Sequence, residues 1–235
     1  MQSLFSPKIV EALNELGFFS PQDIAKAKIE KVFLLLKAKG LTVTNSILWR
    51  LDAFSRNISI EDIDEKRKQE LIQNIKQHPP VAIFPPLERM EFFMQEAINQ
   101  AKIAQTKSEV PVGAVVVHKE QIIATAHNTC ETDNMITKHA ELKVLEQAAK
   151  TIGSYRLDEC DLYVTLEPCP MCAGAIIQSR IRRLIFATKS NKTGAAGGVL
   201  DLFSNRVLNQ HTAVLSGIFE NETTCLLKDF FLLKR

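Results

Sequence analysis

Residues 165–175 read TLEPCPMCAGA, and residues 138–142 read KHAEL. Cysteines three residues apart at the start of a helix can direct both sulfurs to one point, and a helix N-terminus favours the thiolate form. An imidazole adds the nitrogen ligand that zinc commonly takes beside cysteine. The two segments therefore predict a zinc site whose ligands are His139, Cys169 and Cys172.

The predicted site has fewer protein ligands than a structural zinc site, which normally has four. The sequence offers no second C-x-x-C or H-x-x-x-H motif, so one coordination position is left for water. Glu141 is two residues from His139, close enough to reach that water but poorly placed to bind the same metal. This position suits a general base. Taken alone, Glu141 could instead be a first-turn glutamate favoured by the helix dipole.

The other cysteines are weaker candidates for ligands. Cys160 lies at the far end of the strand that leads to Cys169, about 20 Å away at a rise of roughly 3.3 Å per residue. Cys225 is expected to be a buried apolar residue on a helix face. Cys130 follows a strand into a loop, and its spacing leaves it open as a ligand. An odd count of five cysteines favours reduced thiols over disulfides.

Around these motifs, extended apolar runs alternate with segments of helical periodicity. The predicted strands cover residues 112–117, 122–126, 161–166, 183–187 and 212–218. The predicted helices cover residues 88–105, a segment beginning near 139, residues 170–178 and residues 226–233. Strands interleaved with helices imply an α/β fold, here a three-layer α/β/α domain on one mixed sheet of about five strands.

A proline-rich segment divides the chain. Residues 77–87, QHPPVAIFPPL, contain two proline pairs, and proline removes a backbone donor and biases the preceding residue to an extended conformation. We predict a small all-α domain over 1–78, a linker over 79–87 and the α/β domain over 88–235. Apolar residues at helical spacing and an N-cap pattern at Ser20 predict four or five short helices before the linker.

Composition limits the function classes. The 235 residues are 46% hydrophobic, which suits one domain with a core and a smaller companion. The formal net charge is only +2, so affinity for nucleic acid has to come from local clusters of Lys and Arg. The apolar run 32–36 is too short to span a bilayer, and no signal-peptide pattern precedes it. These features predict a cytoplasmic protein with no membrane partner.

The H-A-E and P-C-x-x-C motifs together resemble those of the zinc deaminases, the cytidine deaminase-like superfamily. Within it, the bacterial tRNA adenosine deaminases are most similar, and the resemblance covers residues 88–235. It rests also on EVPVGA at 109–114, Asn128, SRI at 179–181 and KTGAAG at 192–197. The resemblance implies hydrolytic deamination of the wobble adenosine, position 34, to inosine, with one Zn²⁺ per subunit and Glu141 transferring protons between water and the purine.

The same resemblance implies the substrate contacts. Asn128 would hydrogen-bond the target nucleoside, Val110 would form an apolar wall of its pocket, and Lys192 would lie along the RNA approach. An Asx-turn asparagine and a core valine are the structural alternatives. The expected partners are the anticodon loop of an arginine tRNA and a second copy of the chain in a homodimer. Lys192 is part of a basic group that could line the RNA approach or instead form a solvated surface, together with Arg180, Arg182, Arg183 and Lys189.

The sequence departs from the family pattern near the expected RNA contacts. Met135 and Ile136 replace Asp-Pro, Ser190 replaces an aspartate, and Ala187 replaces a glycine. A serine hydroxyl can still donate to or accept from a ribose hydroxyl. We therefore expect altered contact strength at the target and an unchanged reaction.

Residues 5–77 resemble the C-terminal helical domain of TfoX-type competence regulators. The part LNELGFFSPQDIAKA also has the pattern of a helix-hairpin-helix, whose turn amides and helix N-terminus can bind a phosphate. The hypothesis is that this domain adds nonspecific affinity for tRNA. A packing or protein-binding module is the alternative, because the segment is rich in acidic residues as well as lysine.

Other functions use similar zinc ligands. A deaminase of free guanine, cytosine or a nucleotide would keep the chemistry and change the substrate. A catalytically idle zinc fold that only binds RNA would change the class of protein. The KTGAAG loop and the basic end Lys234-Arg235 favour RNA, and the presence of Glu141 beside an open coordination position favours an enzyme.

Overall fold

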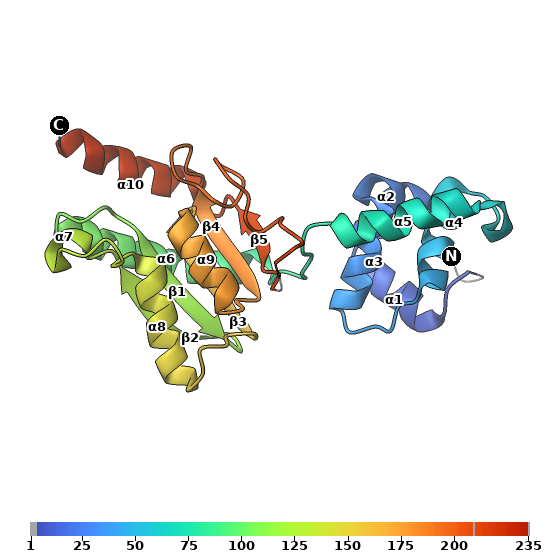
Figure 1. Ribbon diagram of the computed structural model, residues 1–235, viewed down its shortest axis with the longest axis horizontal. Helices are drawn as coiled ribbons and strands as arrows, with labels where there is room; N and C mark the ends of the chain where they lie inside the picture. The colour runs from blue at the N-terminus through green and yellow to red at the C-terminus, as the bar shows by residue number, and fades with distance from the viewer. Residues whose placement is uncertain (1–3, 209, 235) are drawn as a thin grey trace. The chain divides into compact units, whose positions relative to one another are not determined.

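The computed structural model describes residues 4–208 and 210–234. The chain divides into two compact units, residues 1–83 and 84–235 (Figure 1). The division lies inside the proline-rich segment that the sequence predicts as a linker. No helix in the described ranges has both the length and the apolar character required to cross a bilayer.

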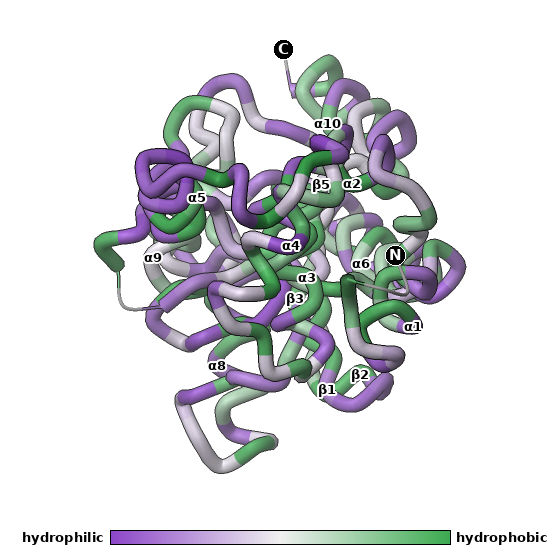
Figure 2. The backbone as a smooth tube through the Cα atoms, turned by 90° about the vertical axis from the view of Figure 1, so that its right-hand side faces the viewer, coloured by the Kyte–Doolittle hydropathy of each residue, from purple (hydrophilic) through white to green (hydrophobic). Residues whose placement is uncertain are grey.

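The first unit is helical, as the sequence predicts. Its helices are α1 (Pro7–Glu15), α2 (Pro21–Ala27), α3 (Ile29–Ala38), α4 (Asn45–Arg56), the 3₁₀ helix η1 (Ile60–Asp62) and α5 (Glu65–Gln77). Apolar faces from these helices form one core, which includes Leu13, Ile24, Val32, Leu48 and Leu71. α5 is mostly hydrophilic along its length (Figure 2) and reaches the core through Leu71.

The turn between α1 and α2 contains the amides that the phosphate hypothesis requires. Ser20 and Asp23 form a capping box at the N-terminus of α2, as the N-cap pattern predicts. The Asp23 carboxylate accepts hydrogen bonds from the amides of Phe19 and Ser20, at 3.0 and 2.8 Å. The amides expected to bind a phosphate are therefore already bonded to a carboxylate, whose charge repels an anion.

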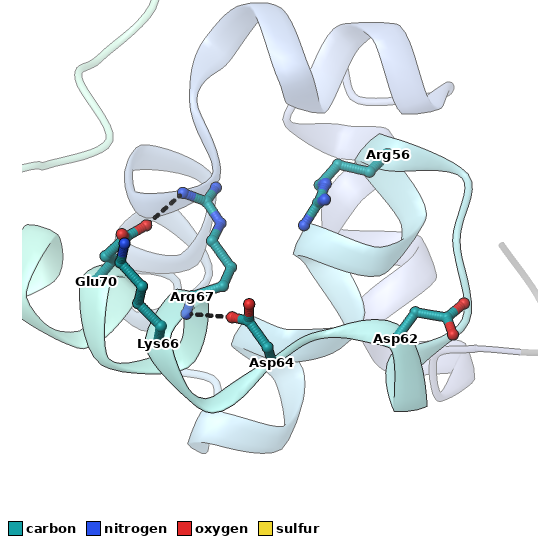
Figure 3. Close-up of a pocket in the computed structure, with 6 residues that line it drawn as sticks. All are labelled: Arg56, Asp62, Asp64, Lys66, Arg67 and Glu70. Carbon is teal, nitrogen blue, oxygen red and sulfur yellow. Dashed lines mark hydrogen bonds and ion pairs between the residues drawn. The ribbon is translucent and has the colours of Figure 1, made fainter.

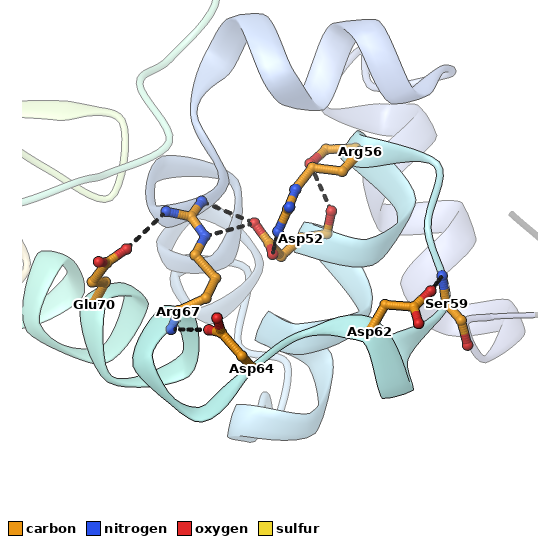
Figure 4. A network of polar contacts seen from close by, with 8 residues as sticks. Asp52, Arg56, Ser59, Asp62, Asp64, Arg67 and Glu70 are labelled. Atoms are coloured by element: carbon orange, nitrogen blue, oxygen red, sulfur yellow. Dashed lines mark hydrogen bonds and ion pairs between the residues drawn. The ribbon is translucent and has the colours of Figure 1, made fainter.

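A buried carboxylate joins α4 to α5. Asp52 is fully buried and accepts hydrogen bonds from Arg67 Nη2 at 2.9 Å and from Arg56 Nη1 at 3.3 Å (Figure 4). A groove of about 490 Å³ lies beside this network (Figure 3). Cationic and acidic side chains both line it, so its charge selects neither an anion nor a cation: Arg56, Lys66 and Arg67 with Asp62, Asp64 and Glu70.

The second unit has the predicted α/β fold. Its strands are β1 (Gly113–His118), β2 (Gln121–His127), β3 (Cys160–Leu166), β4 (Arg183–Thr188) and β5 (Ala213–Ser216). Its helices are α6 (Leu87–Thr106), α7 (Cys130–Asp133), α8 (Ala140–Ile152), α9 (Pro170–Gln178) and α10 (Glu220–Leu233). Among the described residues the strands form one sheet in the order β2-β1-β3-β4-β5. β1 pairs antiparallel with β2 and β3, whereas β3, β4 and β5 are parallel, so the sheet is mixed.

Alternation along the strands separates two cores, one on each face of the sheet. Val115 and Tyr163 pack with α6, while Val116 and Val164 pack with α8 and α9. Figure 1 shows α8 and α9 over the face of the sheet nearer the viewer. Gly113 begins β1 where the backbone of α6 passes so closely that a Cβ atom would lie 2.1 Å from the Ala97 carbonyl oxygen. The domain therefore has the three layers that the sequence predicts.

Two local expectations are wrong. Cys225 is exposed on α10, because the buried face of that helix carries Thr223 and Phe230 instead. The loop expected before His139 contains a short helix, α7, whose four residues are too few to show helical periodicity.

Candidate active site

The predicted metal ligands come from the N-termini of two helices. His139 is the N-cap residue of α8, Cys169 is the N-cap residue of α9, and Cys172 lies in the first turn of α9. Nδ1 of His139 lies 3.4 Å from Sγ of Cys172 and 3.8 Å from Sγ of Cys169. The ligand atoms all lie within 4.8 Å of one another. The fold therefore gathers at one point the residues expected to bind metal.

This donor set fits zinc. Thiolate sulfur and imidazole nitrogen bind Zn²⁺ well, whereas Mg²⁺ and Ca²⁺ prefer oxygen. Over residues 4–208 and 210–234, no other group of His, Cys, Asp or Glu side chains is close enough to hold a metal ion, so Cys130 lies outside the cluster. A hydrogen bond with Cys172 lowers the pKa of Cys169 to about 4, with His139 contributing, although burial opposes the shift. The lowered pKa favours the thiolate of Cys169, the form that binds metal, whereas the same contact raises the pKa of Cys172.

Glu141 lies in the first turn of α8 and is buried. It lines the same cavity as His139 and Cys169, and it is outside the ligand cluster. Burial raises the pKa of Glu141 above its ordinary value. A carboxyl group at this position can exchange a proton with a molecule in the cavity.

The cavity beside the cluster has a volume of about 220 Å³. Both apolar and polar side chains line it. The lining residues are Glu109, Val110, Val112, Asn128, Cys130, Glu131, His139, Glu141, Leu166, Glu167, Cys169 and Thr193. Val110 and Asn128 thus lie where the sequence places them, whereas Lys192 is exposed and contributes no lining, although its neighbour Thr193 does.

The orientation of Asn128 follows from its backbone partner. Its side-chain oxygen accepts a 2.8 Å hydrogen bond from the amide of Ala140, the first residue of α8. Because Oδ1 is used in this way, the Nδ2 group is the part of the side chain suited to donate to a ligand. The same bond ties the cavity wall to the helix that carries His139 and Glu141.

Comparison with known proteins agrees with this geometry. A family model described as MafB19-like deaminase matches residues 88–235, the range that contains the metal cluster and Glu141. This chain belongs to the MafB19-like deaminase family. We refer below to residues 88–235 as the deaminase domain.

Relatives of the deaminase domain include tRNA-modifying enzymes. The tRNA-specific adenosine deaminase of Bacillus subtilis (strain 168) is 45% identical over 141 residues, which are 60% of this chain and 88% of that protein. A solved structure from work on A-to-I editing by tRNA:A34 deaminases at the wobble position has a TM-score of 0.56 and 40% identity, covering 58% of this chain and 99% of the other. A guanine deaminase from Nitrosomonas europaea shares the fold at 23% identity and a TM-score of 0.50. The match covers 67% of this chain and 90% of the other.

Two cavity residues of the deaminase domain have roles that the sequence does not reveal. Glu109 is buried and accepts hydrogen bonds from the amides of Glu131 and Thr132, at 3.1 and 2.7 Å. Glu167 is also buried and accepts hydrogen bonds from main-chain amides of the loop that follows β4. Every residue except proline supplies such an amide, so no side-chain pattern marks these partners.

The basic group expected near the RNA is divided by the fold. Arg182 and Arg183 both bond the buried carboxylate of Asp161, the second residue of β3, at the end of the strand opposite Cys169. Arg180 pairs with Asp158 near the same end. These arginines therefore bond carboxylates at the end of the sheet opposite the metal cluster, and their place along the RNA approach stays a prediction. Lys189 follows β4 at the end of the sheet nearer the cavity.

The Ser190 hydroxyl bonds another residue of its own loop. It lies 3.0 Å from the hydroxyl of Thr193 and accepts a 3.3 Å hydrogen bond from the Thr193 amide. These bonds hold the hydroxyl expected to contact a ribose within its own loop.

Proposed function

We propose that this chain is a tRNA-specific adenosine deaminase that converts the wobble adenosine, position 34, to inosine. The observation that carries the proposal is the cavity shared by the His139–Cys169–Cys172 cluster, Glu141 and Asn128. Similarity to named tRNA adenosine deaminases over nearly the whole of their length supports the RNA substrate. The N-terminal helical unit lies outside the matched range.

The resident metal would be one Zn²⁺ per subunit, held by His139, Cys169 and Cys172. Zinc at such a site supplies Lewis acidity, which makes water a nucleophile at neutral pH. Glu141 would accept a proton from the water that attacks the amine-bearing carbon and deliver it to the adjacent ring nitrogen. It would then carry the second proton to the amine, which leaves as ammonia. Water and adenosine thus yield inosine and ammonia, and Glu141 ends in its starting state.

Asn128 and Val110 would orient the nucleoside. The Nδ2 group of Asn128 would donate a hydrogen bond to the substrate, because Oδ1 is held by Ala140. Val110 would pack against the base. Lys192, exposed beside Thr193, would contact the phosphate backbone of the anticodon loop of an arginine tRNA, and a second copy of the chain would complete the binding surface as a homodimer.

The deciding experiment measures inosine at the wobble position of an unmodified arginine tRNA after incubation with the zinc-loaded full chain. Wild type is compared with Glu141→Gln and with Glu146→Gln, an exposed position on the same helix. We expect inosine from wild type and Glu146→Gln. We expect a loss of about 10²- to 10⁴-fold in Glu141→Gln at unchanged zinc content.

Free adenosine, cytidine and guanine serve as competing substrates in the same assay. Deamination confined to a free base or nucleoside would assign the protein to a metabolic deaminase instead. Zinc binding and tRNA binding without any deamination would indicate an idle zinc fold.

A further inference from the structure

The Glu167 carboxylate is enclosed by the loop of residues 190–198. Its Oε2 atom accepts a hydrogen bond from the Ser190 amide, and its Oε1 atom accepts from the amides of Ala196 and Gly198, each at 2.8 Å. The side chain is 2% exposed. These partners lie 23 to 31 residues away in the sequence, so the bonds close a long segment onto the end of β3.

Glycines allow the loop to approach this carboxylate. A Cβ atom at Gly194 would lie 2.3 Å from Oε2 of Glu167, and one at Gly198 would lie 2.5 Å from the same atom. Both contacts are shorter than van der Waals distance, so only glycine fits while the carboxylate is in place. The position of the buried carboxylate therefore requires glycine at residues 194 and 198 of the loop.

The enclosed loop forms part of the cavity wall. Thr193 lines the cavity with Glu167 itself, and the Ser190 hydroxyl holds Thr193 through its amide and hydroxyl groups. Glu167 in turn accepts a hydrogen bond from the main-chain amide of Ser190. A chain of hydrogen bonds therefore runs from the carboxylate through Ser190 to a residue at the cavity, while the metal ligands and Glu141 come from α8 and α9.

We propose that Glu167 is a positioning residue that fixes the 190–198 loop as the wall of the nucleoside-binding cavity. It acts on substrate binding through Thr193 and the adjacent Lys192, and it takes no part in proton transfer. The proposal builds on the function proposed above, because the bound molecule is taken to be the target nucleoside of tRNA.

Hydrogen exchange on the zinc-loaded full chain tests the anchor without reference to activity. In Glu167→Ala, the amides of Ser190, Ala196 and Gly198 should exchange at least about tenfold faster than in wild type, because each loses its hydrogen-bond acceptor. Glu167→Gln keeps one oxygen able to accept two donors, so only part of this protection should be lost. Glu159→Gln, which changes an exposed carboxylate with 67% of its side chain accessible, should leave these amides unchanged.

Kinetics on the arginine tRNA test the consequence for binding. We expect Glu167→Ala to raise KM about tenfold or more with a smaller effect on kcat, and Glu167→Gln to lie between it and wild type. Gly194→Ala should also raise KM, because its methyl group would displace the Glu167 carboxylate. Zinc content is measured for every variant.

The outcomes separate the alternatives. Unchanged exchange or unchanged KM in folded Glu167→Ala would overturn the proposal. Loss of zinc together with a lower kcat at unchanged KM would also overturn the proposal, since Glu167 would then support the metal ligands. If wild type makes no inosine, the proposed function fails, and the exchange rates still decide whether Glu167 anchors the loop.

Discussion

Buried glutamates at one cavity are used for different tasks. Glu109 and Glu167 each accept hydrogen bonds from main-chain amides of a distant segment. Glu141 lies beside the metal cluster, where burial raises its pKa. The partners of each carboxylate therefore distinguish Glu109 and Glu167, which bond main-chain amides, from Glu141, which is proposed to transfer protons.

Replacement of Glu109 should make stability depend less on pH. Burial raises the pKa of Glu109, but the hydrogen bonds from Thr132, Glu131 and Cys130 together lower it below its ordinary value of 4.5. A lowered folded-state pKa stabilises the fold above the unfolded-state pKa, and that contribution is lost as pH falls through the folded-state value. Glu109→Gln should therefore cost about 1–3 kcal/mol at pH 7.

The measurement is urea unfolding of wild type and Glu109→Gln at pH 7 and at pH values below 4.5. The difference in unfolding free energy should shrink as pH falls. A difference that stays constant across this range would show that the charge of Glu109 does not stabilise the fold.

Tyr163 offers a stabilising substitution. Its ring is fully buried on β3 beside Phe93, and within the described part of the chain its hydroxyl has no hydrogen-bond partner. Removing an unsatisfied buried hydroxyl relieves a desolvation cost, so Tyr163→Phe should raise the unfolding free energy by about 1 kcal/mol. Denaturant midpoints test this, with the exposed Tyr155→Phe as control. A lower midpoint for Tyr163→Phe would indicate a buried water on the hydroxyl.

Buried polar side chains join pairs of elements in both units. In the deaminase domain the Asn128 side chain links the end of β2 to the first amide of α8. In the helical unit the buried Asp52 of α4 bonds Arg67 of α5 (Figure 4). Such contacts fix the position of a helix whose own apolar face is small, and α5 is a helix of this kind.

Loss of Arg67 should therefore loosen α5. Arg67→Met leaves Arg56, which is more exposed, as the cation on the buried carboxylate. We expect a loss of about 1–3 kcal/mol in the unfolding free energy of the helical unit. Lys66→Met, at the exposed neighbouring position, is the matched control and should change stability little. Equal effects of the two substitutions would contradict a structural role for the Asp52 bond.

The whole chain contains separate hydrophobic cores for its two units. One core draws its residues from the helical unit, and the other two draw theirs from residues 84–235. Among the described residues, no buried cluster has members from both units. Each unit should therefore fold without the other.

We expect fragments 1–83 and 84–235 to unfold cooperatively when expressed alone, and calorimetry of the full chain to show the same two transitions. Fragment 84–235 should keep its metal, because every ligand lies within it. An unfolded fragment, or a single transition in the full chain that matches neither fragment, would reveal coupling between the units.

Local sequence determined the features that depend on neighbours in the chain. Helix periodicity predicted the α-helical unit, and the spacing of Cys169 and Cys172 at a helix start predicted a shared ligand position. The capping pattern at Ser20 also formed as expected, because its partners lie within one helical turn. Residue type and short spacing were sufficient in each case.

Contacts between distant segments required the folded chain. The amides that bind Glu167 carry no side-chain signature, and they reach it only because β4 lies parallel to β3. The basic run at Arg182 and Arg183 faces Asp161 for the same reason: the strand starts are adjacent and the metal cluster lies beyond the opposite ends. Hydrogen bonding across a sheet is nonlocal, so strand order and register decide which residues meet.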